Sequence, residues 1–221
     1  MPESNDFAPQ RAEMIEKQLK RRGIEDRGVL AAMLAVPRHE FVATELRSRA
    51  YEDSALPIGI GQTISQPYIV AAMTSALRLQ PTDRALEIGT GTGYQAAVLS
   101  VLAKEIFSIE HLPELASAAS QKLASLGYDR VHVHCGDGTL GLPECAPFDA
   151  ILVAAAAPRA PQPLLAQLAE GGRMIVPVGD EDHQELRLIE KHAGAFTTRI
   201  LEGCRFVPLV GHHGWQNSPQ R

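Results

Sequence analysis

Three glycines beside an acid form a pattern that could bind a charged small molecule. Residues 86–94 read LEIGTGTGY, with Gly89, Gly91 and Gly93 directly after a short apolar run. Glycine here lets the chain turn sharply and lets the backbone approach a ligand, because no Cβ atom stands in the way. We therefore expect a ligand where this strand ends and the next helix begins.

The position of Glu87 helps to separate the two cofactors that such turns commonly hold. A dinucleotide places its pyrophosphate at the helix N-terminus, and a carboxylate just before the turn would repel it. The sulfonium and ammonium groups of S-adenosylmethionine would instead suit Glu87. The spacing also departs from the GxGxxG dinucleotide pattern, because Tyr94 occupies the position of the third glycine. The pattern favours S-adenosylmethionine, and a nicotinamide cofactor is the weaker alternative.

Two further acids follow predicted strands. Glu110 lies about 20 residues beyond the glycine turn, the spacing at which an acid accepts hydrogen bonds from both ribose hydroxyls. Asp137, in the sequence Gly136-Asp137-Gly138, could accept a hydrogen bond from the adenine amino group, although a plain Asp–Gly turn explains the same residues. Together with the acid in the glycine turn, they predict a methyltransferase site.

Short apolar runs alternate with helical patterns from residue 83 onward. Such alternation predicts an α/β fold with a doubly wound, mostly parallel sheet. The last two apolar segments can pair without a helix between them. We expect them to form an antiparallel edge and to complete a seven-stranded sheet of the S-adenosylmethionine-dependent methyltransferase type. The expected strands are 85–88, 106–109, 131–135, 150–153, 174–178, 185–190 and 196–207, and the expected helices are 94–103, 113–126 and 161–168.

The first third of the chain reads as helical. Apolar residues recur at helical spacing between Met14 and Leu19, before Gly23, and a second helical pattern follows. Residues 56–67 are rich in glycine and proline and predict a loop of fixed conformation, whose final proline begins another helix. We expect one domain over residues 1–221, with an N-terminal helical cap of about 8–80, a cofactor-binding core of about 81–180 and C-terminal strands of about 184–210.

Composition disfavours several classes of protein. Hydrophobic residues make up 45% and charged residues 21% of the chain, which is typical of a globular protein. A formal net charge of −5 gives no overall attraction to nucleic acid, and no apolar run approaches the ~20 residues of a membrane span. The three cysteines lack the spacing of a disulfide framework or a zinc site, so no metal is expected. The N-terminus lacks a secretory pattern, and we expect a cytoplasmic monomer.

The sequence resembles the protein-L-isoaspartate (D-aspartate) O-methyltransferase family from about residue 14 to residue 210. Residues 56–68, LPIGIGQTISQPY, are similar to the signature loop of that family, which generic methyltransferases lack. Thr139 and Leu142 stand where the family often has aromatic residues, and Ala154 stands where bacterial relatives often have a hydroxyl residue. Further similarity covers residues 86–94, 136–138, 147–151, 171–179 and 205–210.

The resemblance implies transfer of a methyl group from S-adenosylmethionine to the carboxylate of L-isoaspartyl residues in aged or damaged proteins, which leaves S-adenosylhomocysteine. The ester would cyclise to a succinimide, and its hydrolysis would return some normal aspartate. The resemblance further implies that Ser65 is the catalytic residue. The cofactor-binding residues would be Gln62, Thr63, Ile64, Glu87, Gly89, Gly91, Glu110, Asp137 and Gly138, and the substrate-binding residues would be Ile58, Ser65, Val207 and Pro208.

Elementary chemistry agrees with this role for Ser65. A carboxylate has a reference pKa near ~3.9, so it is ionised at neutral pH and needs no strong general base. The enzyme has instead to align the carboxylate with the methyl donor and to remove its water. Ser65 could donate a hydrogen bond to the acceptor, and it could also cap the helix that begins at Pro67. The alternatives are a related enzyme that methylates another peptide carboxylate and a non-catalytic protein that binds S-adenosylmethionine or aged peptides.

Overall fold

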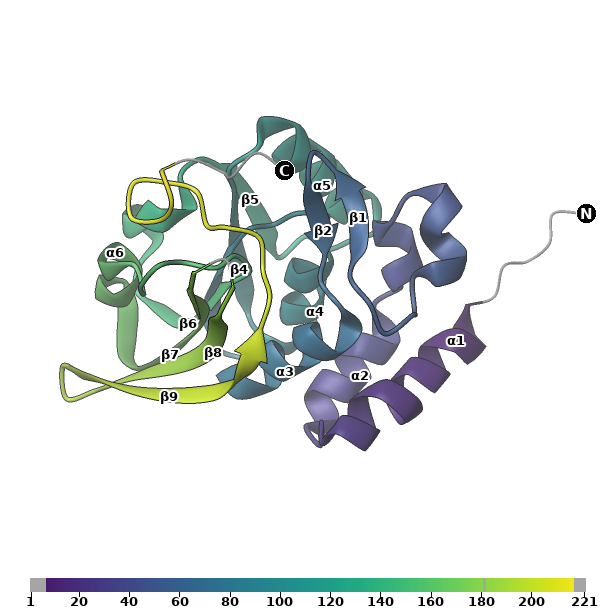
Figure 1. The fold of residues 1–221 in the computed structure, drawn as a ribbon, viewed down its shortest axis with the longest axis horizontal. Coiled ribbons are helices and arrows are strands. Elements are labelled where there is room, and N and C mark those ends of the chain that lie inside the picture. Colours follow the sequence, from purple (N-terminus) through teal and green to yellow (C-terminus); the bar gives the residue numbers. More distant parts are fainter. Residues whose placement is uncertain (1–6, 181, 217–221) are drawn as a thin grey trace, which may run out of the picture.

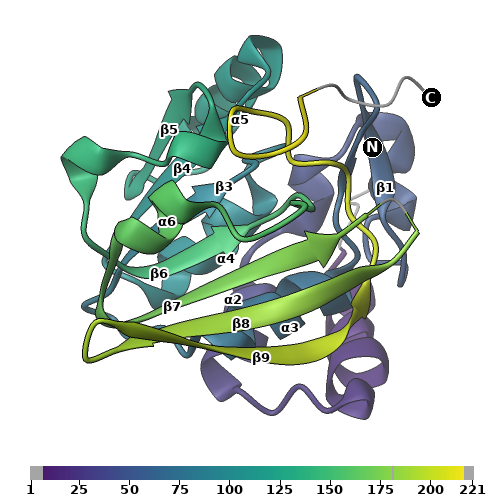
Figure 2. The same ribbon diagram turned by 60° about the vertical axis from the view of Figure 1, so that its left-hand side comes forward.

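The computed structural model describes residues 7–180 and 182–216. Over these residues the chain forms a seven-stranded sheet in the order β5-β4-β3-β6-β7-β8-β9 (Figures 1 and 2). The strands from β5 to β7 are parallel, whereas β8 and β9 are antiparallel to their neighbours, which confirms the predicted sheet. The strands are β3 (Arg84–Ile88), β4 (Glu105–Glu110), β5 (Val131–Cys135), β6 (Phe148–Val153), β7 (Leu168–Gly179), β8 (Gln184–His192) and β9 (Ala195–Cys204).

Helices cover both faces of the sheet because its central strands are apolar on both sides. Alternate residues of β3 show this. Ala85 belongs to one hydrophobic cluster with Leu99, and Leu86 belongs to a second cluster with Leu164. The first face is covered by α3 (Pro67–Leu77) and α4 (Tyr94–Leu102), and the second by α6 (Gln162–Ala166). The remaining helix of the core is α5 (Pro113–Ser125), which packs against β4 and β5.

The N-terminal third forms the predicted helices, which lie together beside the sheet (Figure 1). Gly23 ends the first helical run with a φ of 86°, and the Asp26 side chain caps the next helix by accepting from the Val29 N–H at 3.0 Å. These helices reach α4 through Phe41 and Tyr94, whose ring centroids are 5.6 Å apart. The elements are α1 (Ala8–Glu13), η1 (Met14–Leu19), η2 (Lys20–Arg22), α2 (Arg27–Ala35), η3 (Arg38–Phe41) and η4 (Thr44–Arg49).

The segment expected to be a loop contains a short hairpin. Strands β1 (Leu56–Gly59) and β2 (Gln62–Ile64) pair in an antiparallel manner, and α3 begins at Pro67 as predicted. The two residues between the strands, Ile60 and Gly61, both have positive φ, at 51° and 68°. Proline and glycine concealed the strands in the sequence, because both residues are rare in strands of ordinary sheets.

The C-terminal half departs from the prediction at two boundaries. The helix expected at 161–168 is shorter, because Leu168 already begins β7, a strand of 12 residues. The last strand ends at Cys204, and Pro208 instead forms a parallel bridge with Ala156 after β6. The chain beyond β9 therefore returns to the carboxyl ends of the parallel strands. Between β5 and β6 lie the short turns η5 (Gly138–Leu140) and η6 (Pro143–Cys145).

Candidate active site

A pocket of about 300 Å³ opens at the carboxyl ends of β3 and β4. Ligands of open α/β sheets bind at this edge. The hairpin, the glycine turn, the residues after β4 and the segment 207–210 line it together, although they lie far apart in the sequence. Most of the predicted site residues line this pocket, namely Gln62, Thr63, Ile64, Ser65, Gly89, Gly91, Glu110, Gly138, Val207 and Pro208.

Glu110 is joined to the glycine turn by hydrogen bonds. Its Oε2 atom accepts from the Gly91 N–H at 2.8 Å, and its Oε1 atom accepts from the Leu112 N–H at 3.0 Å. The turn itself needs glycine, because Gly89 and Gly91 have φ values of 92° and 55°. Although Glu110 is only 7% exposed, it forms part of the pocket wall. A carboxylate has about four acceptor positions, so Glu110 keeps capacity for hydroxyl donors from a ligand.

Glu87 lies behind the glycine turn and does not line the pocket. Its side chain is fully buried, Oε2 accepts a hydrogen bond from the Ser108 hydroxyl, and Oε1 has no hydrogen-bond partner in the described structure. Burial raises the pKa of Glu87 to about 8, an effect that the Ser108 hydrogen bond opposes and the charge of Glu110 reinforces. The Ser108 Oγ atom lies 2.6 Å from Thr90 Oγ1, and Thr90 lines the pocket. Glu87 therefore reaches the pocket wall through two hydroxyl groups.

Asp137 also lies outside the pocket, and its carboxylate is occupied by the protein. Oδ1 accepts from the Thr139 N–H at 2.9 Å and from the Thr139 hydroxyl at 2.7 Å, and Oδ2 accepts from the His212 N–H at 2.8 Å. Burial acts to raise the pKa of Asp137, but the hydrogen bonds from His212 and Thr139 outweigh it and lower the pKa. Asp137 thus anchors the C-terminal segment, and its role toward adenine stays a prediction.

Ser65 lies between β2 and α3 and faces the pocket with no hydrogen bond to its hydroxyl among the described residues. Its carbonyl oxygen accepts from Nη2 of Arg38 at 2.7 Å. The helix-capping role that the sequence also allowed is not formed, because Gln66 is the N-cap residue of α3 and makes no side-chain cap bond. The Ser65 hydroxyl is therefore available to donate to a ligand.

The segment 207–210 is held on one side by the chain after β6. The Ala156 N–H donates to the Val207 carbonyl at 2.8 Å, and the Leu209 N–H donates to the Ala156 carbonyl at 2.8 Å. Trp215 adds a hydrogen bond from Nε1 to the same Ala156 carbonyl at 3.0 Å. Val207 and Pro208 line the pocket, whereas Ile58 of the hairpin lies against Gly91 beside it.

Several residues of the pocket were not found from the sequence. His111, Leu112 and Leu115 follow Glu110, and Thr92 and Gln95 follow the predicted glycines. Their positions next to predicted site residues were the available signal. No residue type among them points to a specific reaction, and the fold alone brings them to the pocket.

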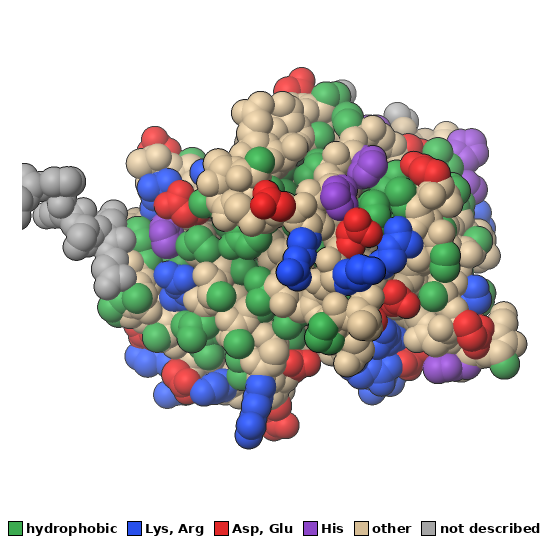
Figure 3. All heavy atoms as spheres, turned by 180° about the vertical axis from the view of Figure 1, so that it is seen from behind, with side chains coloured by type: hydrophobic (Ala, Val, Ile, Leu, Met, Phe, Trp, Pro, Cys, Tyr) green, Lys and Arg blue, Asp and Glu red, His purple; other side chains and the backbone are tan. Residues whose placement is uncertain are grey.

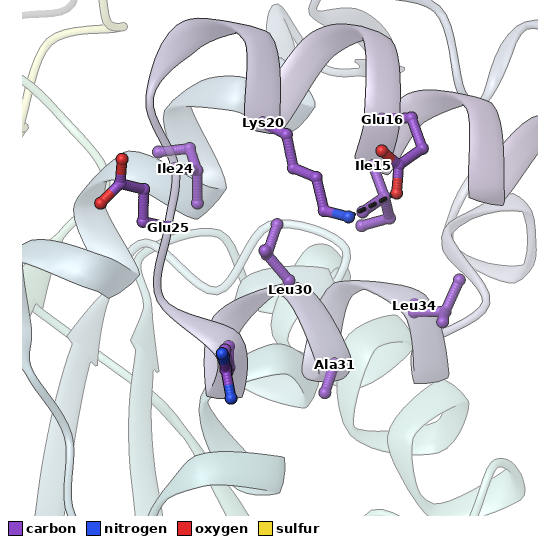
Figure 4. A pocket seen from close by; sticks show the side chains of 9 residues that line it. Ile15, Glu16, Lys20, Ile24, Glu25, Leu30, Ala31 and Leu34 are labelled. Atoms are coloured by element: carbon purple, nitrogen blue, oxygen red, sulfur yellow. Dashed lines mark hydrogen bonds and ion pairs between the residues drawn. The ribbon is translucent and has the colours of Figure 1, made fainter.

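The other described pockets do not bring together a glycine turn, a strand-end acid and Ser65. A groove of about 550 Å³ lies between the N-terminal helices, and Lys20 pairs there with Glu16 at 2.5 Å. Figure 4 shows this pair on one side of the groove and the apolar side chains of Leu30 and Leu34 on the other. None of the predicted site residues is among its described lining residues. Within the described residues, no group of three or more His, Cys, Asp or Glu side chains could hold a metal ion. No helix of that part of the chain is both long and apolar enough to span a membrane.

Solved structures identify the class to which this fold belongs. A protein-L-isoaspartate O-methyltransferase matches 92% of this chain and 67% of its own with a TM-score of 0.84 and 32% identity. A second structure, described as a protein-L-isoaspartate O-methyltransferase from Plasmodium falciparum in complex with S-adenosyl-L-homocysteine, matches 90% of this chain and 98% of its own, with a TM-score of 0.78 and 26% identity. The fold is that of the S-adenosylmethionine-dependent methyltransferases.

Sequence relatives narrow this class to one family. The profile of the protein-L-isoaspartate(D-aspartate) O-methyltransferase family matches residues 9–214, and the chain belongs to this family. Protein-L-isoaspartate O-methyltransferase 1 of Syntrophobacter fumaroxidans is 57% identical over 95% of this chain and 98% of its own length. The protein-L-isoaspartate O-methyltransferase of Koribacter versatilis is 52% identical over 100% of this chain and 98% of its own length.

Proposed function

We propose that this chain transfers a methyl group from S-adenosylmethionine to the free carboxylate of L-isoaspartyl residues in damaged proteins, which begins their repair through a succinimide. The observation that carries the proposal is that Ser65 lines the same pocket as the glycine turn and Glu110. Relatives named for this activity, which match nearly the whole chain, support it.

The residues of the pocket fit the cofactor. Glu110 offers acceptor positions for ribose hydroxyls, and an added Cβ atom at Gly138 would lie 2.5 Å from Ile88 Cγ2, so this part of the wall has no room for a side chain. Glu87, with its unpartnered buried oxygen, offers further polar capacity behind the turn. We propose that the cofactor is contacted by the predicted residues that line the pocket, namely Gln62, Thr63, Ile64, Gly89, Gly91, Glu110 and Gly138. Glu87 and Asp137, which lie outside the pocket, would hold the cofactor through the residues that they bind.

The protein groups act by orientation and exclusion of water. When bound, S-adenosylmethionine would supply an electrophilic methyl group to a carboxylate that is already ionised, so no proton would have to be moved. Ser65 donates a hydrogen bond that fixes the direction of the acceptor carboxylate. Ile58, Val207 and Pro208 contact the substrate chain. Because Pro208 has no N–H, the backbone of this segment offers the substrate fewer donors than an ordinary strand.

We propose that the partners are aged proteins and peptides, that the protein acts as a cytoplasmic monomer, and that it binds neither nucleic acid nor membranes. The cysteines among the described residues are free thiols, which suits a reducing compartment. Cationic and anionic side chains are interspersed over the face seen in Figure 3, and the net charge is −5, so a polyanion would find little attraction. We also propose that the chain acts as one domain, with its helical cap, core and C-terminal strands contributing to one pocket.

Mass spectrometry of an isoaspartyl peptide tests the proposal. Incubation with the protein and S-adenosylmethionine should add one methyl group to the peptide, followed by loss of methanol to a succinimide and the return of some aspartyl peptide. The matched control is the same peptide with S-adenosylhomocysteine in place of the donor. An isoaspartyl peptide that stays unmethylated while the cofactor binds would contradict the proposed acceptor.

A further inference from the structure

Arg38 is a fully buried cation that connects the N-terminal helices to the pocket. Its relative exposure is 0%, and it is the largest of the fully buried side chains described. Nε donates to the Ala50 carbonyl at 2.7 Å, and Nη2 donates to the Ser65 carbonyl at 2.7 Å. The guanidinium carbon lies 4.9 Å from the centroid of the Tyr94 ring. One side chain therefore contacts both Ser65 and the first residue of α4.

Among the residues that the structure describes, no carboxylate compensates the charge of Arg38. No ion pair described for the chain includes Arg38, and Nη1 has no hydrogen-bond partner there. Burial lowers the pKa of Arg38, and the phenol groups of Tyr94 and Tyr51 oppose this effect. Two carbonyl oxygens and the ring of Tyr94 thus replace the water that the guanidinium loses. An apolar side chain of similar volume would often stabilise such a site as well or better, so packing alone does not account for an arginine.

Ser65 needs an external group to fix its backbone. It follows the last paired residue of β2, Ile64, and precedes the helix, whose first hydrogen bond runs from the Val70 N–H to the Gln66 carbonyl. The Ser65 carbonyl therefore belongs to neither the hairpin ladder nor the helix. Its described partner is Arg38, which fixes the peptide plane that follows the serine.

We propose that Arg38 is a positioning residue for methyl transfer, which holds the Ser65 backbone so that the Ser65 hydroxyl points at the acceptor carboxylate. The inference rests on the proposed function, because that function gives Ser65 the task of orienting the acceptor. Arg38 is absent from the described lining of the pocket, so it acts through Ser65. Tyr94 does line the pocket, so the same guanidinium sets Ser65 relative to the start of α4.

The shape of the guanidinium group explains why arginine suits this position. Its planar fork donates to Ala50 and Ser65 at the same time while its face lies over Tyr94. A lysine ammonium keeps the charge, but it cannot reproduce this fixed geometry. The substitution R38K therefore separates the positioning of Ser65 from the presence of a buried charge.

The test is a double-mutant cycle with R38K and S65A, read out as single-turnover and steady-state methylation of an isoaspartyl peptide. The matched control is R173K. Arg173 is also a largely buried arginine with one unpartnered nitrogen, and it donates to Asp83 at 3.1 Å and to the Arg78 carbonyl at 3.1 Å. Arg173 pairs with Ala150 near the start of β6, at the opposite end of the strands from the pocket.

We expect R38K to lower kcat by about 10- to 100-fold, because a small displacement of an orienting group is costly. The Kd for S-adenosylmethionine should stay within about twofold of the wild-type value. In the S65A background, R38K should lower the methylation rate less than about twofold, because the group it positions is gone. R173K should lower the melting temperature and leave kcat of the folded protein unchanged.

Each other outcome overturns one specific statement. If R38K lowers the methylation rate by the same factor in the wild-type and the S65A background, the positioning role is wrong. An unchanged kcat in R38K would also overturn that role. In both cases the proposed function stands. A wild-type protein that fails to methylate the isoaspartyl peptide would overturn the proposed function itself. If R38K does not fold even in a stabilising osmolyte, Arg38 serves the fold as a whole, and its assignment to Ser65 is wrong.

Discussion

Glu110 accepts a hydrogen bond from the backbone N–H of Gly91 at 2.8 Å. The acid at the end of β4 thereby holds the turn at the end of β3, and its second oxygen binds the Leu112 N–H. The acid and the turn therefore act as one unit. A change at Glu110 should alter both the proposed acceptor for the ribose hydroxyls and the conformation of the loop beside it.

Glu110→Ala should weaken S-adenosylmethionine binding by about 10- to 100-fold, because hydrogen bonds to a charged group contribute ~1.5–3 kcal/mol. Glu110→Gln keeps an acceptor for one backbone N–H and should lose less. Isothermal titration calorimetry measures both affinities. The control is Glu114→Gln, an exposed acid in the first turn of α5, which should bind normally. Unchanged affinity in Glu110→Ala would refute the ribose role.

Ser65→Ala should retain cofactor binding and lose most turnover. The lost hydrogen bond to an ionised acceptor corresponds to about a 10- to 100-fold fall in kcat. Because the backbone of Ser65 keeps its contact with Arg38, the fold should be preserved. Steady-state methylation of an isoaspartyl peptide measures the change, with Ser117→Ala at an exposed position of α5 as the control. Full activity in Ser65→Ala would remove the hydroxyl from the mechanism.

Glu87 should make the stability of the cofactor-free protein depend on pH. Its pKa in the folded protein is about 8, compared with an ordinary value of 4.5. Below pH 4.5 both the folded and the unfolded chain hold the proton, so the stabilising contribution is fully present. Between these values only the folded chain keeps the proton, so the free energy of unfolding falls as pH rises, at up to about 1.4 kcal/mol per pH unit. The contribution is lost above pH 8.

Glu87→Gln removes this ionisation and keeps an acceptor for Ser108. The free energy of unfolding of the variant minus that of the wild-type protein should therefore increase between pH 5 and pH 8, by an amount on the order of a few kcal/mol. Urea denaturation of both proteins across this range gives the difference. A difference that does not vary with pH would mean that Glu87 ionises normally in the folded state.

Gly138→Ala should be far more damaging than Gly136→Ala. An added Cβ atom at Gly138 would lie 2.5 Å from Cγ2 of Ile88, a buried residue beside the pocket. An added Cβ atom at Gly136 would have no neighbouring atom within 4 Å. Overpacking of this kind costs about 1–3 kcal/mol, and it should also weaken cofactor binding. Thermal melts with and without S-adenosylmethionine compare the two variants. Equal melting temperatures for the two alanine variants would show that the wall around Gly138 yields freely.

The alternation of strands and helices was readable from the sequence because buried parallel strands are continuous apolar runs. The hairpin β1–β2 was not, because its Pro57, Gly59 and Gly61 are typical of loops. The boundary between α6 and β7 was misplaced because Leu168 fits either pattern, and only pairing with Phe148 decides it. Such long-range pairings leave no local signal.

Some features of the site could likewise be predicted from the sequence and others could not. Glycine spacing and strand-end acids indicated the turn and Glu110, which lie together in the structure. The burial of Glu87 and the contact of Asp137 with His212 depend on packing between distant segments, so no spacing rule reveals them. The buried position of Arg38 also depends on packing, and the sequence does not predict it because arginine usually lies at the surface.

The proposed activity is tested most directly by methyl transfer from radiolabelled S-adenosylmethionine to two synthetic peptides that differ only in an L-isoaspartyl or an L-aspartyl residue at one position. Base-labile label is expected on the isoaspartyl peptide alone. Absence of label on both peptides, with cofactor binding intact, would contradict it.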